Sequence, residues 1–286
     1  MKHTIKQTSK NTHVLKVYDD CEILCISDLH WDHPHCDRKL LKRHLDAAKE
    51  KGSPVLINGD FFCVMQTPHD RRSSKGSTRK EHENADYISS IVRDAVEWFK
   101  PYSDILFLVG LGNHETGLMK HTGFNIAQSF VDMMKYACPD SPICLSGYSG
   151  FLAIQCYKHN KNRNSAILYY HHGAGGNAPV TLGVLNTARN GAMVQGADFV
   201  WTGHVHKEWC VTRPIFRLNH KQSGVECKDV VYFSTAGYKD SFDSGYAGWE
   251  VEKNMGPATL GGAWITVEHR SPHRQHFVVF DVRRAK

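Results

Sequence analysis

Apolar residues in this chain occur in short runs, and several of these runs end at polar residues of metal-binding type. The runs are Ile23–Ile26, Val55–Ile57, Ile105–Val109, Ala166–Tyr170 and Phe199–Trp201. Short continuous apolar runs, without alternation, are typical of strands that are buried on both faces, as in parallel sheets. The pattern predicts an α/β fold with parallel central strands.

Helical spacing is found between these runs. Apolar residues recur every three to four positions in three segments, which predicts helices over Arg38–Lys51, Asn84–Phe99 and Phe124–Tyr136. Further strands are expected over His13–Tyr18, as a strand pair within residues 143–158, and in a second sheet that contains Trp209–Arg217, Val230–Phe233, Ala263–Val267 and Gln275–Arg283. The expected architecture is two packed mixed β-sheets flanked by helices.

Length and composition favour one soluble domain. The chain has 286 residues, 41% of them apolar, and no Pro/Gly/Ser linker divides it, so we expect a single domain over residues 1–286. No stretch is long and apolar enough for a membrane helix, and Met1–Val14 lacks the apolar core of a signal peptide. The nine cysteines include no C-x-x-C pair, which favours free thiols in a reducing compartment. We expect a cytoplasmic protein without a membrane partner.

The blocks that follow the apolar runs carry the candidate chemistry. They are Asp28-Leu29-His30, Gly59-Asp60, Gly112-Asn113-His114-Glu115, His171-His172-Gly173 and Gly203-His204-Val205-His206. Ligands of open α/β sheets collect at the carboxyl ends of the strands, so these side chains should converge. In extended backbone, the side chains of two residues that are separated by one other residue point to the same side. Asp28 and His30, on either side of Leu29, could therefore bind one ion. Carboxylates, imidazoles and an amide together suit two divalent cations.

This series of blocks, in this order, resembles the calcineurin-like metallophosphoesterase superfamily over about residues 22–210. The resemblance implies two ions that share Asp60. The first would also be bound by Asp28, His30 and His206, and the second by Asn113, His204 and one histidine of the pair His171/His172. Family members with His-Gly after this strand favour His172, whereas those with His-x-Pro favour His171. Both histidines remain candidates.

The same resemblance implies a mechanism. His114 would not bind metal but would stabilise developing charge and donate a proton to the leaving oxygen, while a metal-bridging hydroxide attacks phosphorus. Manganese is the first expectation, and zinc, iron or magnesium would also fit the ligands. Glu115 would either orient backbone or His114, or be an ordinary acid at a helix N-terminus.

The expected substrate is a phosphate ester, and a phosphodiester of nucleotides or nucleic acid is the leading hypothesis. Leu111 precedes Gly112, where protein-phosphatase relatives have an arginine, which disfavours a phosphoserine/threonine phosphatase. The alternatives are a phosphomonoesterase and a non-catalytic binding scaffold. The likeness extends to phage-type or prophage-type members through features such as the His-rich turn of 28–38 and the glycines of 173–176.

A basic insertion at about residues 66–83 is the candidate for substrate binding. Arg71 and Arg72 would grip phosphate by paired hydrogen bonds, or the segment is a solvated loop. The net charge of +6 is a mild excess that is compatible with anionic substrates. Four aromatic residues would either contact bases or belong to the core: Trp31, Phe61, Phe62 and Trp249.

Overall fold

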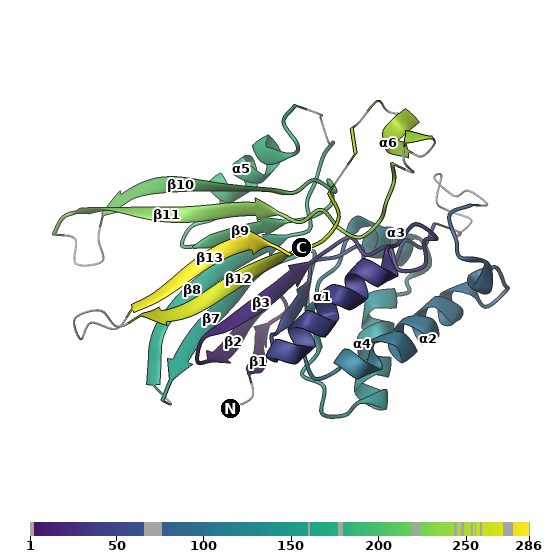
Figure 1. Ribbon diagram of the computed structural model, residues 1–286, viewed down its shortest axis with the longest axis horizontal. Coiled ribbons are helices and arrows are strands. Elements are labelled where there is room, and N and C mark those ends of the chain that lie inside the picture. The colour runs from purple at the N-terminus through teal and green to yellow at the C-terminus, as the bar shows by residue number, and fades with distance from the viewer. Residues whose placement is uncertain are drawn as a thin grey trace.

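The two predicted sheets pack face to face. The computed structural model describes residues 3–65, 76–159, 161–176, 180–218, 223–242, 245–246, 249–252, 254, 256–257, 259–270 and 277–285. Apolar side chains from both sheets, such as Leu15, Ile23, Leu56 and Leu168, form one buried cluster between them. Helices cover the outer faces (Figure 1). The predicted fold class, α/β with two packed mixed sheets flanked by helices, is confirmed.

One sheet contains the first three apolar runs. In spatial order its described strands are β13 (Phe277–Arg284), β12 (Ala263–Arg270), β3 (Cys21–Ile26), β4 (Val55–Ile57), β5 (Leu106–Val109) and β6 (Cys144–Leu145). Strands β3 to β6 are parallel, while β12 is antiparallel to both β3 and β13. The carboxyl ends of β3, β4 and β5 therefore lie side by side at one edge.

The other sheet contains the last two runs. Its described strands, in spatial order, are β1 (Thr4–Ser9), β2 (Thr12–Tyr18), β7 (Ser149–Lys158), β8 (Lys161–His171), β9 (Phe199–Thr202), β11 (Val225–Ser234) and β10 (Trp209–Leu218). Strands β8, β9 and β11 are parallel, and β2 is parallel to β7. All five apolar runs thus lie in parallel strands, as predicted.

Helices form two layers outside the sheets. Helices α1 (Arg38–Lys51), α2 (Tyr87–Phe99) and α4 (Ile126–Ala137) pack on the sheet that contains β3, and α5 (Val184–Ala192) packs on β9 and β11. The remaining described helices are α3 (Asn113–Thr122), α6 (Trp249–Glu252) and the 3₁₀ turns η1 (Lys80–His82) and η2 (Lys100–Tyr102). Helix α1 matches its predicted bounds because Asp37 accepts hydrogen bonds from the N–H groups of Lys39 and Leu40, and Gly52 ends the helix in left-handed conformation.

Two sequence predictions of strand pairing are wrong. The segment 143–158 does form two strands, but β6 pairs with β5 and β7 pairs with β2 and β8, so they belong to different sheets. The four C-terminal strands exist as well but do not share one sheet. Strands β10 and β11 extend the sheet of β9, whereas β12 pairs with β3 through partners such as Trp264 and Leu24. Periodicity locates a strand but does not specify its neighbour.

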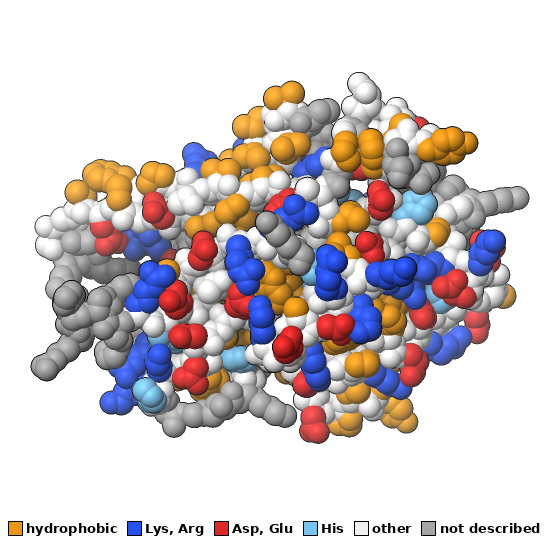
Figure 2. Space-filling model, viewed as in Figure 1, with side chains coloured by type: hydrophobic (Ala, Val, Ile, Leu, Met, Phe, Trp, Pro, Cys, Tyr) orange, Lys and Arg blue, Asp and Glu red, His pale blue; other side chains and the backbone are white. Residues whose placement is uncertain are grey.

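The aromatic candidates are core residues where the structure describes their side chains. Trp31, Phe61 and Phe62 are fully buried between the sheet and its helices, so none of them can stack on a base. The side chain of Trp249 lies outside the described part of the chain. Exposed apolar side chains instead gather along the β10–β11 hairpin, which includes Phe216 and Leu218, on the face shown in Figure 2. No helix among the described residues is both long and apolar enough to cross a membrane.

Asp32 fixes the segment that follows β4. This carboxylate is completely buried and accepts hydrogen bonds from the N–H groups of Cys63 (2.6 Å) and Val64 (3.0 Å) and from the Tyr87 hydroxyl (2.5 Å). A buried donor that loses its acceptor costs the full free energy of its desolvation. Asp32 therefore ties the turn after β3 to the chain after β4 and to helix α2.

Replacement of Asp32 by alanine should lower the free energy of unfolding by about 3 kcal/mol, because two backbone N–H groups and a hydroxyl lose their acceptor. Urea denaturation measures this loss. Asp86→Ala is the matched control, since the Asp86 side chain is 77% exposed and its ion pair with Arg93 is long, 3.6 Å. The control should change stability by less than about 1 kcal/mol. Equal stability of the two variants would contradict a structural role for Asp32.

Candidate metal centre

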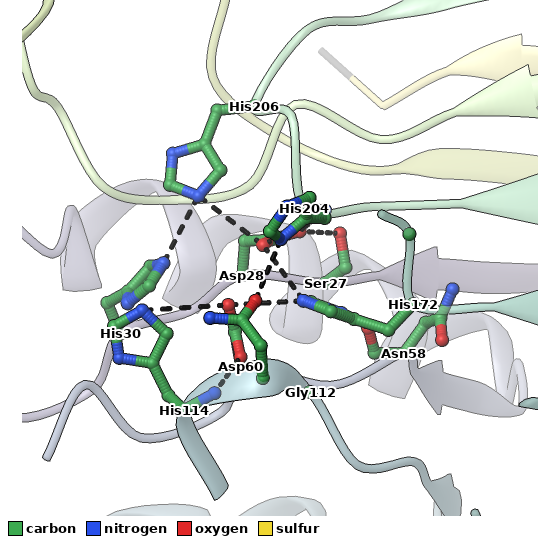
Figure 3. Close-up of polar contacts among 12 residues, drawn as sticks. Ser27, Asp28, His30, Asn58, Asp60, Gly112, His114, His172, His204 and His206 are labelled. Atoms are coloured by element: carbon green, nitrogen blue, oxygen red, sulfur yellow. Dashed lines mark hydrogen bonds and ion pairs between the residues drawn. The ribbon is translucent and has the colours of Figure 1, made fainter. Parts of the chain in front are cut away.

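The five polar blocks meet where the parallel strands of both sheets end (Figure 3). Strand β3 leads to Asp28 and His30, β4 leads to Asp60, and β5 leads to the first turn of α3, which contains Asn113 and His114. From the other sheet, β8 leads to His172, and β9 leads to His204 and His206. The site thus lies across the junction of the two sheets.

Asp28, His30 and His206 form the first potential metal-binding group. The Nε2 atom of His206 lies 3.3 Å from Asp28 Oδ1 and 3.1 Å from His30 Nε2. Asp28 is fully buried, and its Oδ2 accepts hydrogen bonds from the Ser27 hydroxyl (2.5 Å) and from the His204 N–H (2.9 Å). The backbone and Ser27 therefore orient this carboxylate toward the two imidazoles.

Asp60, His172 and His204 form the second group. The Nε2 atom of His172 lies 3.1 Å from Asp60 Oδ2, and His204 Nδ1 lies 2.7 Å from the amide oxygen of Asn113. Although it is this close to a carboxylate, the buried His172 Nε2 makes no hydrogen bond with any described residue. The nitrogen and the oxygen thus form an ion-pair contact without hydrogen-bond geometry, and a cation could take the place of the His172 proton between them. These donors fit a divalent metal ion.

The two groups lie next to each other. Asp28 Oδ1 of the first group is 3.9 Å from His172 Nε2 of the second. The donors of both are carboxylate oxygens and imidazole nitrogens, with the Asn113 amide beside the second, a set that suits manganese, zinc or iron. The residues predicted as ligands are thus brought together, with the exception of His171.

His172, and not His171, points into the site. The His172 Nδ1–H donates to the Asn58 carbonyl oxygen at 2.8 Å, which leaves Nε2 directed at Asp60. His171 Nδ1 instead accepts a hydrogen bond from the Gly173 N–H at 3.0 Å, outside both groups. The role of Asn58 was not predicted from the sequence, because a backbone carbonyl can act through any residue type.

The backbone of the site is not extended, contrary to the geometry expected for Asp28 and His30. Residues Asp28, His30, Asp60, His204 and His206 all have positive φ angles, between 46° and 70°. This left-handed conformation is strained for residues that carry a Cβ, and it concentrates at functional sites. The chain thus turns sharply after each strand. In Asp28-x-His30 and His204-x-His206, these turns set the directions of the two side chains, and the alternation of a strand does not.

Two glycines allow the close approach of neighbouring segments. A Cβ atom on Gly112 would lie 2.1 Å from Asp60 Oδ1, and a Cβ on Gly203 would lie 2.5 Å from Asp28 Oδ2. Both distances are far inside van der Waals contact. The glycine before each of these blocks is therefore needed so that the chain after one strand can pass against the carboxylate of another.

His114 lies beside the second group. Its N–H donates to Asp60 Oδ1 (3.0 Å), and its ring Nδ1 contacts the Cys63 carbonyl oxygen (2.5 Å). Because a carbonyl only accepts, Nδ1 carries the proton and Nε2, 3.8 Å from Asp60 Oδ2, is the nitrogen that faces the carboxylates. His114 is thus held at the edge of the site by its backbone and by one ring nitrogen.

Glu115 orients backbone. Its buried carboxyl group accepts hydrogen bonds from the N–H groups of Gly112 (2.8 Å), Asp60 (3.1 Å) and Phe62 (2.9 Å). Burial, followed by the negative charge of Asp60, raises the pKa of Glu115 to about 7. Of the two interpretations of this residue, the contacts support the one in which it positions the backbone.

Both carboxylates of the site have pKa values below the ordinary value although burial disfavours their charge. For Asp60, the charges of His172 and His114 outweigh burial and hold the pKa well below its ordinary value. Burial also disfavours the charged form of His172 and by itself would lower its pKa. The negative charges of Asp60 and Asp28 outweigh this effect and raise the pKa of His172 to about 10. The centre is therefore built to stabilise positive charge between Asp28 and Asp60, and a metal ion would replace the His172 proton there.

Basic groups border the site. The segment Tyr238–Asp240 pairs with the turn after β3, since Cys36 and Lys239 form a β-bridge and Asp37 N–H donates to Tyr238 O. Burial and then the positive charge of Lys239 lower the pKa values of both His30 and His33. Arg71 and Arg72, the predicted phosphate contacts, lie outside the described residues.

Comparison with known proteins leaves the family open. No protein-family model and no curated protein matches this chain. Among solved structures, the chain is similar to Vacuolar Protein Sorting 29 from Cryptosporidium parvum, with a TM-score of 0.39, 12% identity, and coverage of 93% of this chain and 100% of that one. It is also similar to a conserved uncharacterized protein, a predicted phosphoesterase, from Streptococcus pneumoniae, with a TM-score of 0.34, 13% identity, and coverage of 91% and 88%. Both TM-scores are below 0.5, and neither likeness assigns a function.

Gly112→Ala should abolish or strongly weaken metal binding, because the new methyl group would displace Asp60. Gly117→Ala is the matched control in helix α3, where a Cβ meets nothing within 4 Å. The control should bind metal normally and gain about 0.5–1 kcal/mol of stability, as expected for alanine in a helix interior. Metal content after dialysis and thermal unfolding distinguish the variants. Wild-type metal content in Gly112→Ala would contradict the close packing against Asp60.

Proposed function

We propose that this chain is a dinuclear metal-dependent phosphoesterase that hydrolyses phosphodiester bonds of nucleotides or nucleic acid. The observation that carries the proposal is the pair of adjacent ligand groups, Asp28–His30–His206 and Asp60–His172–His204, with His114 beside them. Two divalent ions bound there would clamp phosphoryl oxygens and lower the pKa of a bound water. Membership of the calcineurin-like metallophosphoesterase superfamily, and a phage-type origin, are part of the proposal.

Manganese is the ion that we propose for both positions. The mixture of carboxylate, imidazole and amide donors suits it, and zinc, iron and magnesium are the alternatives. Affinity alone favours zinc over manganese, so the choice depends on availability and on activity with each ion. Hydrolysis by metal-stripped protein, measured with each ion in turn, therefore identifies the ion that supports activity.

His114 supplies the proton in this proposal. With Nδ1–H directed at the Cys63 carbonyl, Nε2 is the nitrogen that would carry the second proton and release it to the leaving oxygen of the substrate. The protonated ring would also stabilise negative charge that develops on phosphorus-bound oxygens. The hydrogen bond between His114 N–H and Asp60 Oδ1 links the position of this acid to that of the metal ligand.

Substrate phosphate would be bound by the basic border of the site. Lys239 forms a β-bridge with Cys36 in the turn after β3, and Arg79 donates to the Cys36 carbonyl oxygen at 3.1 Å. These cations would neutralise the ester phosphate beyond the metal ions. Arg71 and Arg72 belong to the same proposal, in a segment that begins shortly after Asp60.

A phosphoserine/threonine phosphatase is disfavoured because Leu111 stands where the protein-phosphatase relatives carry a phosphate-binding arginine. The phosphomonoesterase of the same superfamily is the second candidate. A binding scaffold is less favoured because the two ligand groups and His114 lie together in one site. We propose a cytoplasmic location, with phosphate esters as the partners of this site.

His114→Ala should reduce phosphodiester hydrolysis by about 10²–10⁴-fold while it retains metal, because the variant lacks only the proton donor. Asp60→Asn should instead lose metal, since it weakens the charge that holds the cations. Turnover and metal content, measured on both variants, separate these effects. His121→Ala, an exposed position in α3, serves as the control and should behave as wild type. Full metal occupancy in Asp60→Asn would argue against Asp60 as a shared ligand.

Metal-stripped protein supplied with Mn²⁺ should cleave bis-p-nitrophenyl phosphate faster than p-nitrophenyl phosphate, in keeping with a diester site. Both reactions release the same chromophore, so their rates compare directly. Turnover of the monoester alone, with single-stranded DNA also left intact, would replace the leading proposal by a phosphatase. Absence of any turnover in protein that carries its metal would favour the scaffold.

A further inference from the structure

Residues 235–238, directly after strand β11, pass along Asp28 of the first ligand group. The Thr235 hydroxyl lies 2.6 Å from that of Ser27, the neighbour of Asp28. A Cβ atom on Gly237 would lie 2.7 Å from Asp28 Cβ, and the Tyr238 N–H donates to the Asp28 carbonyl oxygen at 3.0 Å. A segment from the C-terminal part of the chain therefore touches the backbone, the Cβ atom and the neighbouring hydroxyl of this carboxylate residue.

Hydrogen bonds run in one direction from Trp201 to Asp28. The Trp201 Nε1–H can only donate, and it donates to Thr235 Oγ1 at 3.1 Å. At the other end, Ser27 donates its one hydroxyl proton to Asp28 Oδ2 (Figure 3). Thr235 must therefore be the donor in its contact with Ser27. The other acceptor near the Thr235 hydroxyl, the Thr202 carbonyl oxygen, is more distant, at 3.4 Å.

This chain of hydrogen bonds is closed to solvent. Its members are each at most 1% exposed: Trp201, Thr235, Ser27 and Asp28. Hydrogen bonds that follow one another in a buried network polarise and strengthen each other, and water cannot replace a lost member. The hydroxyl of Thr235 thus affects the strength of the last bond in the chain, the one that Asp28 accepts.

The last bond determines which oxygen of Asp28 faces the ligand histidines. Oδ2 accepts from Ser27 and, at 2.9 Å, from the His204 N–H, which lies slightly farther from Oδ1, at 3.1 Å. Oδ1 is the oxygen that lies 3.3 Å from His206 Nε2. The hydrogen bonds to Oδ2 therefore hold the carboxylate with Oδ1 directed into the first ligand group.

The segment 235–238 is itself fixed at several points. The Thr235 N–H donates to the Thr202 carbonyl oxygen at 3.1 Å, and Gly237 forms a β-bridge with Gly261. Tyr238 is fully buried, and its hydroxyl lies 2.8 Å from Nδ1 of His44 in helix α1. A ligand is held most precisely when the residues behind it are locked by their own contacts. The segment meets this condition.

We propose that residues 235–238 are a positioning element for the metal ligand Asp28, acting through the hydroxyl of Thr235 and the absence of a side chain at Gly237. Trp201 completes the element as the donor at the far end of the hydrogen-bond chain. None of these residues binds metal or touches substrate. The inference rests on the proposed function in one respect, that Asp28 binds a metal ion. Groups that orient a metal ligand typically change metal affinity by about 10–100-fold.

Thr235→Val replaces the hydroxyl by a methyl group of similar size and interrupts the chain. It should weaken binding of the ion that Asp28→Asn loses by about tenfold, whereas Thr235→Ser, which keeps the hydroxyl, should bind as wild type. Titration of metal-free, full-length protein with Mn²⁺, followed through the electron paramagnetic resonance signal of free Mn²⁺, measures the affinity. Thr187→Val is the matched control, because Thr187 is also buried and its hydroxyl contacts Thr202 outside this chain. The control should bind Mn²⁺ normally.

Gly237→Ala tests the same element independently, since its methyl group would displace Asp28. Gly196→Ala is the matched control: φ is 82° at Gly237 and 84° at Gly196, but a Cβ at Gly196 meets nothing within 4 Å. Both variants should lose stability through backbone strain, and only Gly237→Ala should bind the ion at least about tenfold more weakly. Equal affinity of the two glycine variants would refute a role of Gly237 in placing Asp28.

The variants also separate this inference from the proposed function. If Asp28→Asn binds Mn²⁺ as the wild type does, Asp28 binds no ion, and the proposed centre fails together with its positioning element. If Asp28→Asn loses an ion but Thr235→Val and Gly237→Ala bind normally, the inference alone is overturned. Thermal unfolding of the metal-free variants shows whether each is folded. Should Thr235→Val not fold, Trp201→Phe removes only the first donor of the chain and should weaken binding by about threefold.

Discussion

The structure of the site depends on the burial of two carboxylates, Asp28 and Asp60, at the junction of the two sheets. A buried negative charge is tolerated only if cations or hydrogen-bond donors surround it. Asp28 accepts hydrogen bonds from the Ser27 hydroxyl and the His204 N–H. Asp60 accepts a hydrogen bond from the His114 N–H and forms an ion pair with the His172 ring. Each contact joins segments that follow different strands. The need to satisfy these two charges therefore determines how the strand ends of both sheets come together.

This constraint also explains why so many residues of the site have unfavourable backbone conformations. Positive φ angles at Asp28, Asp60 and His204 turn the chain immediately after each strand, so that a ligand is presented within one or two residues of the buried sheet. Such strain costs free energy and persists only where the surrounding packing enforces it. Here the enforcing contacts include the glycines at 112 and 203, which let neighbouring segments touch the carboxylates. Rigid strands on both sides then hold the ligand atoms in place.

Much of this arrangement could be predicted from the sequence, because it depends on local signals. Continuous apolar runs predicted the parallel strands, and the polar blocks after them predicted where ligands would gather. Strand neighbours were not predictable, since the pairing of β12 with β3 joins Trp264 to Leu24 across most of the chain. The extended backbone that was predicted for Asp28 and His30 was also wrong, because Asp and His residues in left-handed conformation cannot be recognised from their spacing in the sequence. The choice of His172 over His171 depends on the Asn58 carbonyl, which no side-chain pattern reveals.

The segment from Asp60 to Val64 shows how one stretch without regular secondary structure serves both packing and chemistry. Four of its backbone N–H groups donate to buried carboxylates: those of Asp60 and Phe62 to Glu115, and those of Cys63 and Val64 to Asp32. These two acids belong to neither of the oxygen-rich ligand groups, and their hydrogen bonds act on the site through the backbone. Between the anchored positions, Phe61 and Phe62 fill the core while Asp60 and Cys63 face histidines. Because the acceptors are themselves buried, water cannot replace them, and the positions of Asp60, Cys63 and His114 are fixed as one unit.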